Sequence, residues 1–145
     1  MSESATPQVR SGKVENYGLW GVQVLLALTF LGAGLMKIVK TAEQLAASQA
    51  WVPHFSPLMV RGIGVLEVLG AIALIVPSAS RIMPKLTVYA AIGLALLMLG
   101  AAGTHVMIGE GAMAVAPLIL AVLCVLVAWG RTRGAVIAPK STKNA

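Results

Sequence analysis

The residue with the clearest chemical role is Glu67, a carboxylate within an otherwise apolar run from Leu58 to Val76. Such a run is long enough to cross a lipid bilayer. A charge at the middle of a membrane helix costs roughly 2.5–3.5 kcal/mol on insertion scales, so Glu67 must be protonated, hydrated or paired with a cation. An acid in this position predicts a functional or assembly site that has a partner group.

The element that carries Glu67 is one of four apolar segments in a chain of 145 residues, of which 58% are hydrophobic and 11% charged. Soluble domains have roughly 45–50% and 25%. Each segment holds close to the ~20 residues that cross a bilayer. The sequence therefore predicts an all-α integral membrane four-helix bundle, with helices at about 19–36, 58–76, 86–103 and 112–129. A mobile polar tail (1–18) and a basic tail (132–145) are expected to flank it.

Basic residues next to the apolar segments predict the orientation, because Lys and Arg concentrate on the cytoplasmic side. Four crossings place both tails and the second connection on one side. That side holds eight basic residues against three on the other: Arg10, Lys13, Arg81, Lys85, Arg131, Arg133, Lys140 and Lys143, against Lys37, Lys40 and Arg61. Both termini are therefore predicted to be cytoplasmic. The net charge of +6 does not indicate nucleic-acid binding, because the basic residues do not cluster with aromatic residues. They lie next to the apolar segments, where they indicate orientation in the membrane.

The first outer connection, residues 38–57, is the longest. Thr41 and Gln44 have the spacing of a capping box, which predicts a short interfacial helix that runs to Trp51. Pro53 and Pro57 then predict a non-helical entry into the second crossing. The connection is either a cover over the outer end of the bundle or a lid over a substrate.

Topology brings three ionisable residues to the same outer end of the bundle. Lys37 ends the first helix and His105 ends the third. Glu67 lies six residues after Arg61, which begins the second helix, and is therefore about 9 Å deeper in the membrane. A lysine stem reaches far enough to meet the acid. We expect a compact polar site of Lys37, Glu67 and His105, with Arg61 and Glu110 at its rim. The pair either locks the first two helices or forms part of a binding site.

Several other chemistries are disfavoured. His105 at a helix end is typical of a capping or interfacial group. A haem between two histidines would require His54, in a proline-flanked loop, to face His105. No His, Asp or Glu set has metal-ligand spacing on one helix face. Cys124 has no second cysteine, which excludes an internal disulfide and a CxxC couple.

Three short motifs resemble the DoxX-like family: AGxxK ending at Lys37, GxxE ending at Glu67 and GAxxxH ending at His105. The likeness extends over about residues 19–131. It implies a small four-helix protein of the bacterial inner membrane, a subunit or assembly helper of a larger complex. Lys37, Glu67 and His105 match the polar positions of the family, as does Glu110.

Two functions remain open from the sequence. In the first, the protein is a non-catalytic membrane subunit that docks another membrane protein or a second copy, and its Glu67 site binds a polar headgroup or small molecule. In the second, it is an oxidoreductase component that holds a quinone head between Lys37, Glu67 and His105, the last two carrying protons. A proton path is less favoured, because no ionisable residue continues from Glu67 to Arg81. A quinone is the only cofactor suggested.

Overall fold

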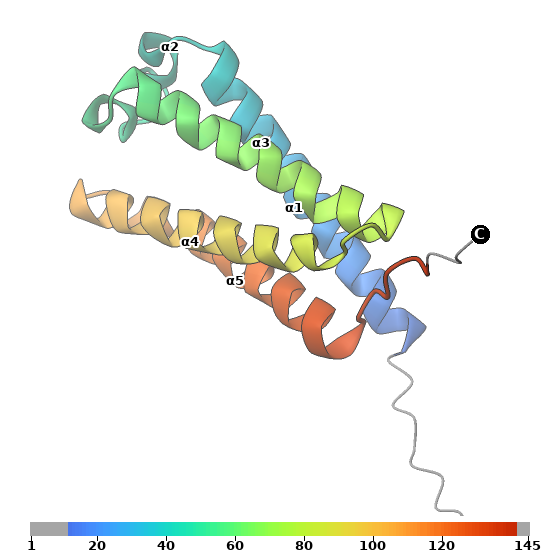
Figure 1. The fold of residues 1–145 in the computed structure, drawn as a ribbon. Coiled ribbons are helices and arrows are strands. Elements are labelled where there is room, and N and C mark those ends of the chain that lie inside the picture. Colours follow the sequence, from blue (N-terminus) through green and yellow to red (C-terminus); the bar gives the residue numbers. More distant parts are fainter. Residues whose placement is uncertain (1–11, 142–145) are drawn as a thin grey trace, which may run out of the picture.

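A computed structural model describes residues 12–141, and its ordered elements are all helical. Four long helices form the bundle: α1 (Lys13–Val39), α3 (Pro57–Ser80), α4 (Lys85–Met107) and α5 (Val115–Trp129) (Figure 1). Shorter helical elements are α2 (Ala42–Ala46), 3₁₀ turns at Val52–His54 and Gly111–Ala114, and a π-turn at Gly130–Gly134. The helices α1, α3 and α4, and the continuous helical stretch Gly111–Gly134 that contains α5, are each long and apolar enough to cross a membrane. The predicted all-α membrane bundle is confirmed.

The long helices associate as two pairs. α1 packs mainly on α3, α4 packs mainly on α5, and contacts between α3 and α4 join the pairs. In Figure 1 the pairs lie close together where α1 begins and α5 ends, and they diverge toward α2. We call the first region the terminal end and the second the loop end.

Two glycines bring α1 and α3 into close contact. A Cβ atom at Gly34 would lie 2.6 Å from the Gly64 carbonyl oxygen, and one at Gly64 would lie 2.8 Å from the Gly34 carbonyl oxygen. Real side chains do not tolerate such distances, so only glycine permits this crossing. Lys37 and Glu67 each follow one of these glycines by three residues.

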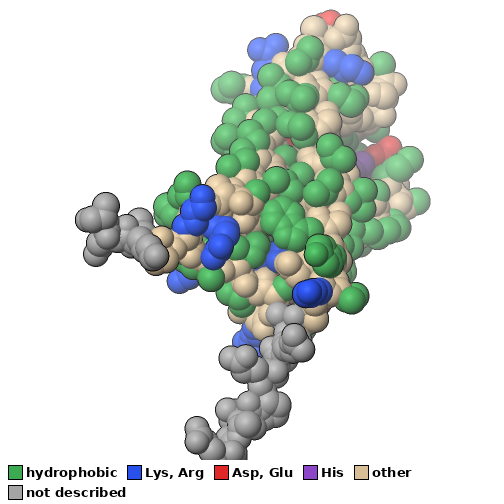
Figure 2. Space-filling model, turned by 90° about the vertical axis from the view of Figure 1, so that its right-hand side faces the viewer, with side chains coloured by type: hydrophobic (Ala, Val, Ile, Leu, Met, Phe, Trp, Pro, Cys, Tyr) green, Lys and Arg blue, Asp and Glu red, His purple; other side chains and the backbone are tan. Residues whose placement is uncertain are grey.

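Apolar side chains form both the core and the exterior. The core at the centre of the bundle includes Leu26, Phe30, Leu74, Cys124 and Val127, all almost fully buried. Many leucines, valines and isoleucines are nevertheless exposed. Figure 2 shows hydrophobic side chains along the bundle, with Lys and Arg gathered toward its ends. A surface of this kind is expected where lipid replaces water.

Three of the long helices, α1, α3 and α4, extend beyond the predicted apolar segments, whereas α5 begins at Val115, three residues after its predicted start. α1 begins at Lys13 and not near residue 19, so part of the predicted polar tail is helical, whereas residues 1–11 lie outside the described part. α4 continues to Met107 and thereby includes His105. The end of an apolar segment is not the end of its helix. Backbone hydrogen bonds set the helix end, and they continue among the polar residues that follow the segment.

The second crossing does not end at about residue 76, as its apolar segment predicted. α3 continues to Ser80 with Pro77 inside it. Proline has no N–H group, so it leaves the carbonyl four residues earlier, that of Ala73, without its helical donor. The Thr87 hydroxyl of α4 donates to this oxygen at 3.1 Å, and the Ser78 hydroxyl donates to Thr87 at 2.8 Å.

The first connection contains the predicted capping box. The Thr41 side chain accepts from the Gln44 backbone, and the Gln44 side chain accepts from the Thr41 backbone. The helix α2 nevertheless ends at Ala46, five residues before the predicted end at Trp51. A 3₁₀ turn follows, and Ser56 then caps α3.

Candidate functional site

Lys37 and Glu67 form an ion pair inside the bundle. The Lys37 Nζ donates to Glu67 Oε1 at 3.0 Å and to Oε2 at 2.8 Å, and the two side chains are 10% and 4% exposed. Helical side chains lean toward the N-terminus of their helix. Since α1 and α3 run in opposite directions, Lys37 leans toward the terminal end and Glu67 toward the loop end. The two side chains therefore lean toward each other.

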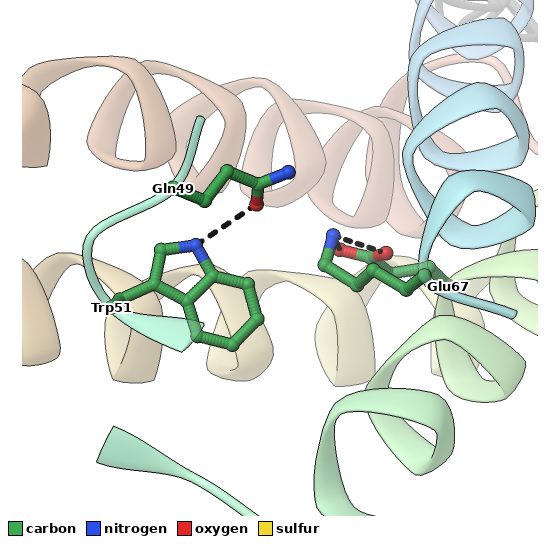
Figure 3. Close-up of polar contacts among 4 residues, drawn as sticks. Gln49, Trp51 and Glu67 are labelled. Carbon is green, nitrogen blue, oxygen red and sulfur yellow. Dashed lines mark hydrogen bonds and ion pairs between the residues drawn. The ribbon is translucent and has the colours of Figure 1, made fainter. Parts of the chain in front are cut away.

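Aromatic residues of the first connection cover this pair. The Trp51 ring lies 5.8 Å from the Lys37 Nζ, in cation–π geometry. The Trp51 Nε1 donates to the Gln49 side chain at 3.0 Å (Figure 3). Phe55 packs edge-on against Trp51, with ring centroids 5.7 Å apart. The connection thus covers the loop end, while its predicted role as a lid stays untested.

A cavity of about 440 Å³ lies beside the ion pair. All four long helices contribute to its wall, together with Trp51 and Phe55. Most of the wall is apolar: Phe30, Ile63, Leu97, Met98, Pro117 and Leu120. The hydroxyls of Thr29 and Thr104 also line it, but each donates to a carbonyl of its own helix. These hydroxyls are left only as acceptors, so the donors and charged groups offered to a ligand are those of Lys37, Glu67 and His105.

His105 reaches the same cavity from α4. Its Nδ1 lies 3.1 Å from Glu110 Oε2, and Glu110 is half-buried in the following turn. A carboxylate at Nδ1 fixes the orientation of the imidazole ring. The other ring nitrogen has no hydrogen-bond partner among residues 12–141. Glu110 therefore orients His105 and is not part of the cavity wall.

The geometry divides the predicted site. Lys37, Glu67 and His105 line one cavity, as the topology argument expected. Arg61 does not line it; this exposed side chain borders a smaller cavity of about 260 Å³. Whether the three lining residues serve a function stays a prediction.

A second polar cluster, at the terminal end, was missed by the sequence reasoning. The Gln23 side chain donates to the Leu74 carbonyl at 2.6 Å and accepts from Arg131 Nε at 2.6 Å. Arg131 Nη1 donates to the Asn16 side chain at 2.6 Å and to the Ala135 carbonyl at 3.0 Å. Gln23 is fully buried and Arg131 is 4% exposed. Gln23, an amide in an apolar segment, was the residue that could have indicated this cluster. Arg131 was interpreted only as one of the basic residues that predict the orientation in the membrane.

Comparison with known proteins identifies the family. The model of the DoxX-like family matches residues 21–127, well over half of the chain. The chain belongs to the DoxX-like family. The match runs from α1 into α5, so it includes Lys37, Glu67 and His105 and stops before Arg131. No significant match is found among curated proteins or among solved structures.

This DoxX-like protein is a multi-pass integral membrane protein, as its family and its four apolar helices indicate. Within residues 12–141, no group of three His, Cys, Asp or Glu residues is placed to hold a metal ion. Cys124 is fully buried in the apolar core. The chemistry offered at the loop end is hydrogen bonding by an ammonium, a carboxylate and an imidazole in a mostly apolar chamber.

Proposed function

We propose that this DoxX-like protein is a non-catalytic membrane subunit that binds an amphipathic small molecule in the cavity beside Lys37 and Glu67. The observation that carries the proposal is a mostly apolar cavity of about 440 Å³ with a buried ion pair in its wall. Ligand sites generally have volumes of about 300–1,000 Å³ and a few fixed polar groups. The apolar wall suits a hydrocarbon body, and the pair suits a polar head.

The ion pair favours a neutral polar head. Lys37 has three N–H donors, and two of them are used by the Glu67 oxygens. The third is free to donate to a carbonyl, hydroxyl or ester oxygen. Because the charges of Lys37 and Glu67 cancel, an anionic or cationic head would gain no net attraction from them.

Identification of the bound molecule tests the proposal. The full chain is purified in mild detergent, and small molecules in an organic extract are identified and counted by mass spectrometry. We expect one class of neutral amphipathic molecule near one copy per protein, enriched over the surrounding lipid. Lys40→Met is the control, because Lys40 is exposed at the same end. Extracts that repeatedly contain only bulk lipid would contradict the proposal.

A quinone is the second candidate, and His105 favours it. His105 on α4 and Lys37 on α1 bring two donors to one cavity from different helices. A quinone head has two carbonyl oxygens, and its reduction needs protons that Glu67 and His105 are able to carry. In this role the protein is a quinone-binding component of an oxidoreductase system.

Quenching of Trp51 fluorescence tests this candidate. Trp20→Phe and Trp129→Phe leave Trp51, which lines the cavity, as the single reporter. A short-chain quinone is expected to quench it saturably. His105→Gln is expected to weaken binding roughly tenfold, the effect of about one hydrogen bond. Linear quenching without saturation would exclude quinone binding in this cavity.

The family also supports proposals on location and partners. We place the protein in a bacterial inner membrane with both termini in the cytoplasm and the Glu67 site toward the outer leaflet. It would act there as a subunit or assembly factor beside another membrane protein or a second copy. An impermeant maleimide added to intact cells should label Met107→Cys and spare Lys140→Cys; the opposite pattern would reverse the orientation. Both positions are exposed, whereas native Cys124 is buried.

A further inference from the structure

The charge of Arg131 at the terminal end lacks a counter-ion. Its three hydrogen bonds go to uncharged acceptors: two side-chain amides and a backbone carbonyl. No carboxylate lies within 4.0 Å of it among residues 12–141. Its Nη2 is also buried and has no hydrogen-bond partner within this part of the chain. The Trp20 ring lies 5.2 Å from the Arg131 guanidinium carbon, in cation–π geometry, but an aromatic face carries no net charge. A buried charge is costly unless it is paired, so Arg131 still favours an anion nearby.

Arg131 also lines a cavity of about 600 Å³ at the same end. The cavity lies between the start of α4 and the C-terminal segment that follows the π-turn, and Lys85 and Tyr89 contribute polar groups to it. No acidic residue of the described chain lines it. The carboxylate of Glu15 lies beside Gly134 and is not part of the wall.

The C-terminal segment is held in place as one side of this cavity. Arg81 Nε donates to the Ala138 carbonyl at 2.9 Å, and the Lys140 backbone N–H donates to the Arg81 carbonyl at 3.1 Å. The segment contributes apolar side chains, Val136 and Ile137, opposite Val88 of α4. The cavity thus has a basic part and an apolar part, both at an end of a membrane bundle.

We propose that this cavity binds the phosphate of a net-anionic headgroup, with Arg131 and Lys85 as its basic partners. Guanidinium and ammonium groups form charge-assisted hydrogen bonds with phosphate oxygens. The N-terminus of α4, a helix of 23 residues, adds a favourable dipole. Basic pockets between membrane helices near the cytoplasmic surface commonly take anionic lipid headgroups. The apolar side chains of the wall suit the glycerol and upper acyl chain of such a lipid.

Native mass spectrometry of the full chain tests the proposal. Phosphatidylglycerol and phosphatidylcholine are titrated separately into the detergent-solubilised protein, and their dissociation constants are compared. We expect tighter binding of phosphatidylglycerol, and a roughly fivefold loss of this preference in Lys85→Gln, the effect of one basic residue near a membrane surface. Arg133→Gln is the matched control, because Arg133 is exposed at the same end and does not line the cavity.

Lys85 is exposed, so Lys85→Gln should change lipid binding without destabilising the fold. Arg131 is buried, so a loss of binding in Arg131→Gln could come from misfolding. Millimolar inorganic phosphate identifies the source of the anion. Displacement of phosphatidylglycerol by phosphate would show that the cavity recognises the phosphate group itself, and persistence of the lipid would assign the cavity to a lipid headgroup. Equal binding of the two lipids, or equal losses in Lys85→Gln and Arg133→Gln, would overturn the proposal.

Discussion

The two ends of the bundle bury a basic side chain in different ways. At the loop end Lys37 meets a carboxylate, Glu67, and the charges cancel. At the terminal end Arg131 meets two amides, a carbonyl and the face of the Trp20 ring, none of which carries a negative charge. Glu67 lies ten residues into α3, roughly 15 Å from its start, whereas Arg131 follows α5 by two residues. A deep charge must carry its counter-ion within the fold, whereas a charge near the interface is able to take one from its surroundings.

The ends also differ in which elements they join. The Lys37–Glu67 pair joins α1 to α3 beside their glycine crossing, with the two residues starting from opposite sides of it. The Gln23–Arg131 cluster joins α1 to the π-turn after α5 and to the carbonyl of Leu74 in α3. The loop-end pair therefore stabilises the contact between α1 and α3 beside a cavity. The terminal-end cluster stabilises the contact between the two helix pairs.

Removing one member of the loop-end pair should have the largest effect on stability. Glu67→Leu leaves Lys37 buried without a counter-ion, and loss of one partner of a buried pair costs about 3–5 kcal/mol. Adding Lys37→Met should recover most of this loss, because the remaining charge is removed. Reversible unfolding in mixed detergent measures both variants.

Glu43→Leu is the control for this comparison, since Glu43 is exposed at the same end and should change stability by no more than about 0.5 kcal/mol. If Glu67→Leu proved as stable as Glu43→Leu, the pair would not be buried as described.

Gln23→Leu should weaken the terminal end by a smaller amount. It leaves the Arg131 Nε without its partner, whereas the Leu74 carbonyl still accepts from the Thr87 hydroxyl, and an unsatisfied buried group costs about 1–3 kcal/mol. The same unfolding assay measures the loss, and Gln23→Glu sharpens the result. A carboxylate there would neutralise Arg131, so this variant should keep more stability than Gln23→Leu. Equal losses in the two variants would contradict an uncompensated charge at this end.

Gly34→Ala tests the glycine crossing that positions the loop-end pair. Its Cβ would lie 2.6 Å from the Gly64 carbonyl oxygen, so the helices must separate, at a cost of about 1–3 kcal/mol. Gly32→Ala is the control on the same helix, where nothing lies within 4 Å. It should be neutral or stabilising, because alanine favours a helix by roughly 1 kcal/mol over glycine. Similar effects of the two substitutions on unfolding would argue against close contact.

Thr87→Val should give the smallest effect, near the terminal end. It removes the hydroxyl that donates to the Ala73 carbonyl beside Pro77 and accepts from Ser78, so the loss should be at least the roughly 1 kcal/mol of one hydrogen bond. Thr104→Val is the control, because the Thr104 hydroxyl donates to a carbonyl of its own helix, which already takes part in helical bonding. No difference between the two variants in the unfolding assay would remove the assigned role of Thr87.

The sequence predicted the loop end better than the terminal end. Four long apolar segments and one charge inside them led to the bundle and to Glu67, and topology then placed Lys37 and His105 near it. The Gln23–Arg131 cluster joins residues 108 positions apart, and Gln23, although it is an amide in an apolar segment, does not by itself indicate its partner. The passage of α3 through Pro77 depends on Thr87 of another helix. Such long-range hydrogen bonds leave no local pattern in a sequence.

The most direct test of the binding role of the loop end is the ligand content of the Lys37→Met, Glu67→Leu double variant. This variant should remain folded, so any change in ligand content reports on the cavity and not on stability. We predict that wild-type protein retains a neutral amphipathic molecule near one copy per chain and that the double variant loses it. A folded double variant that keeps the same molecule in the same amount would contradict a role of the pair in binding. The pair would then serve only to stabilise the contact between α1 and α3.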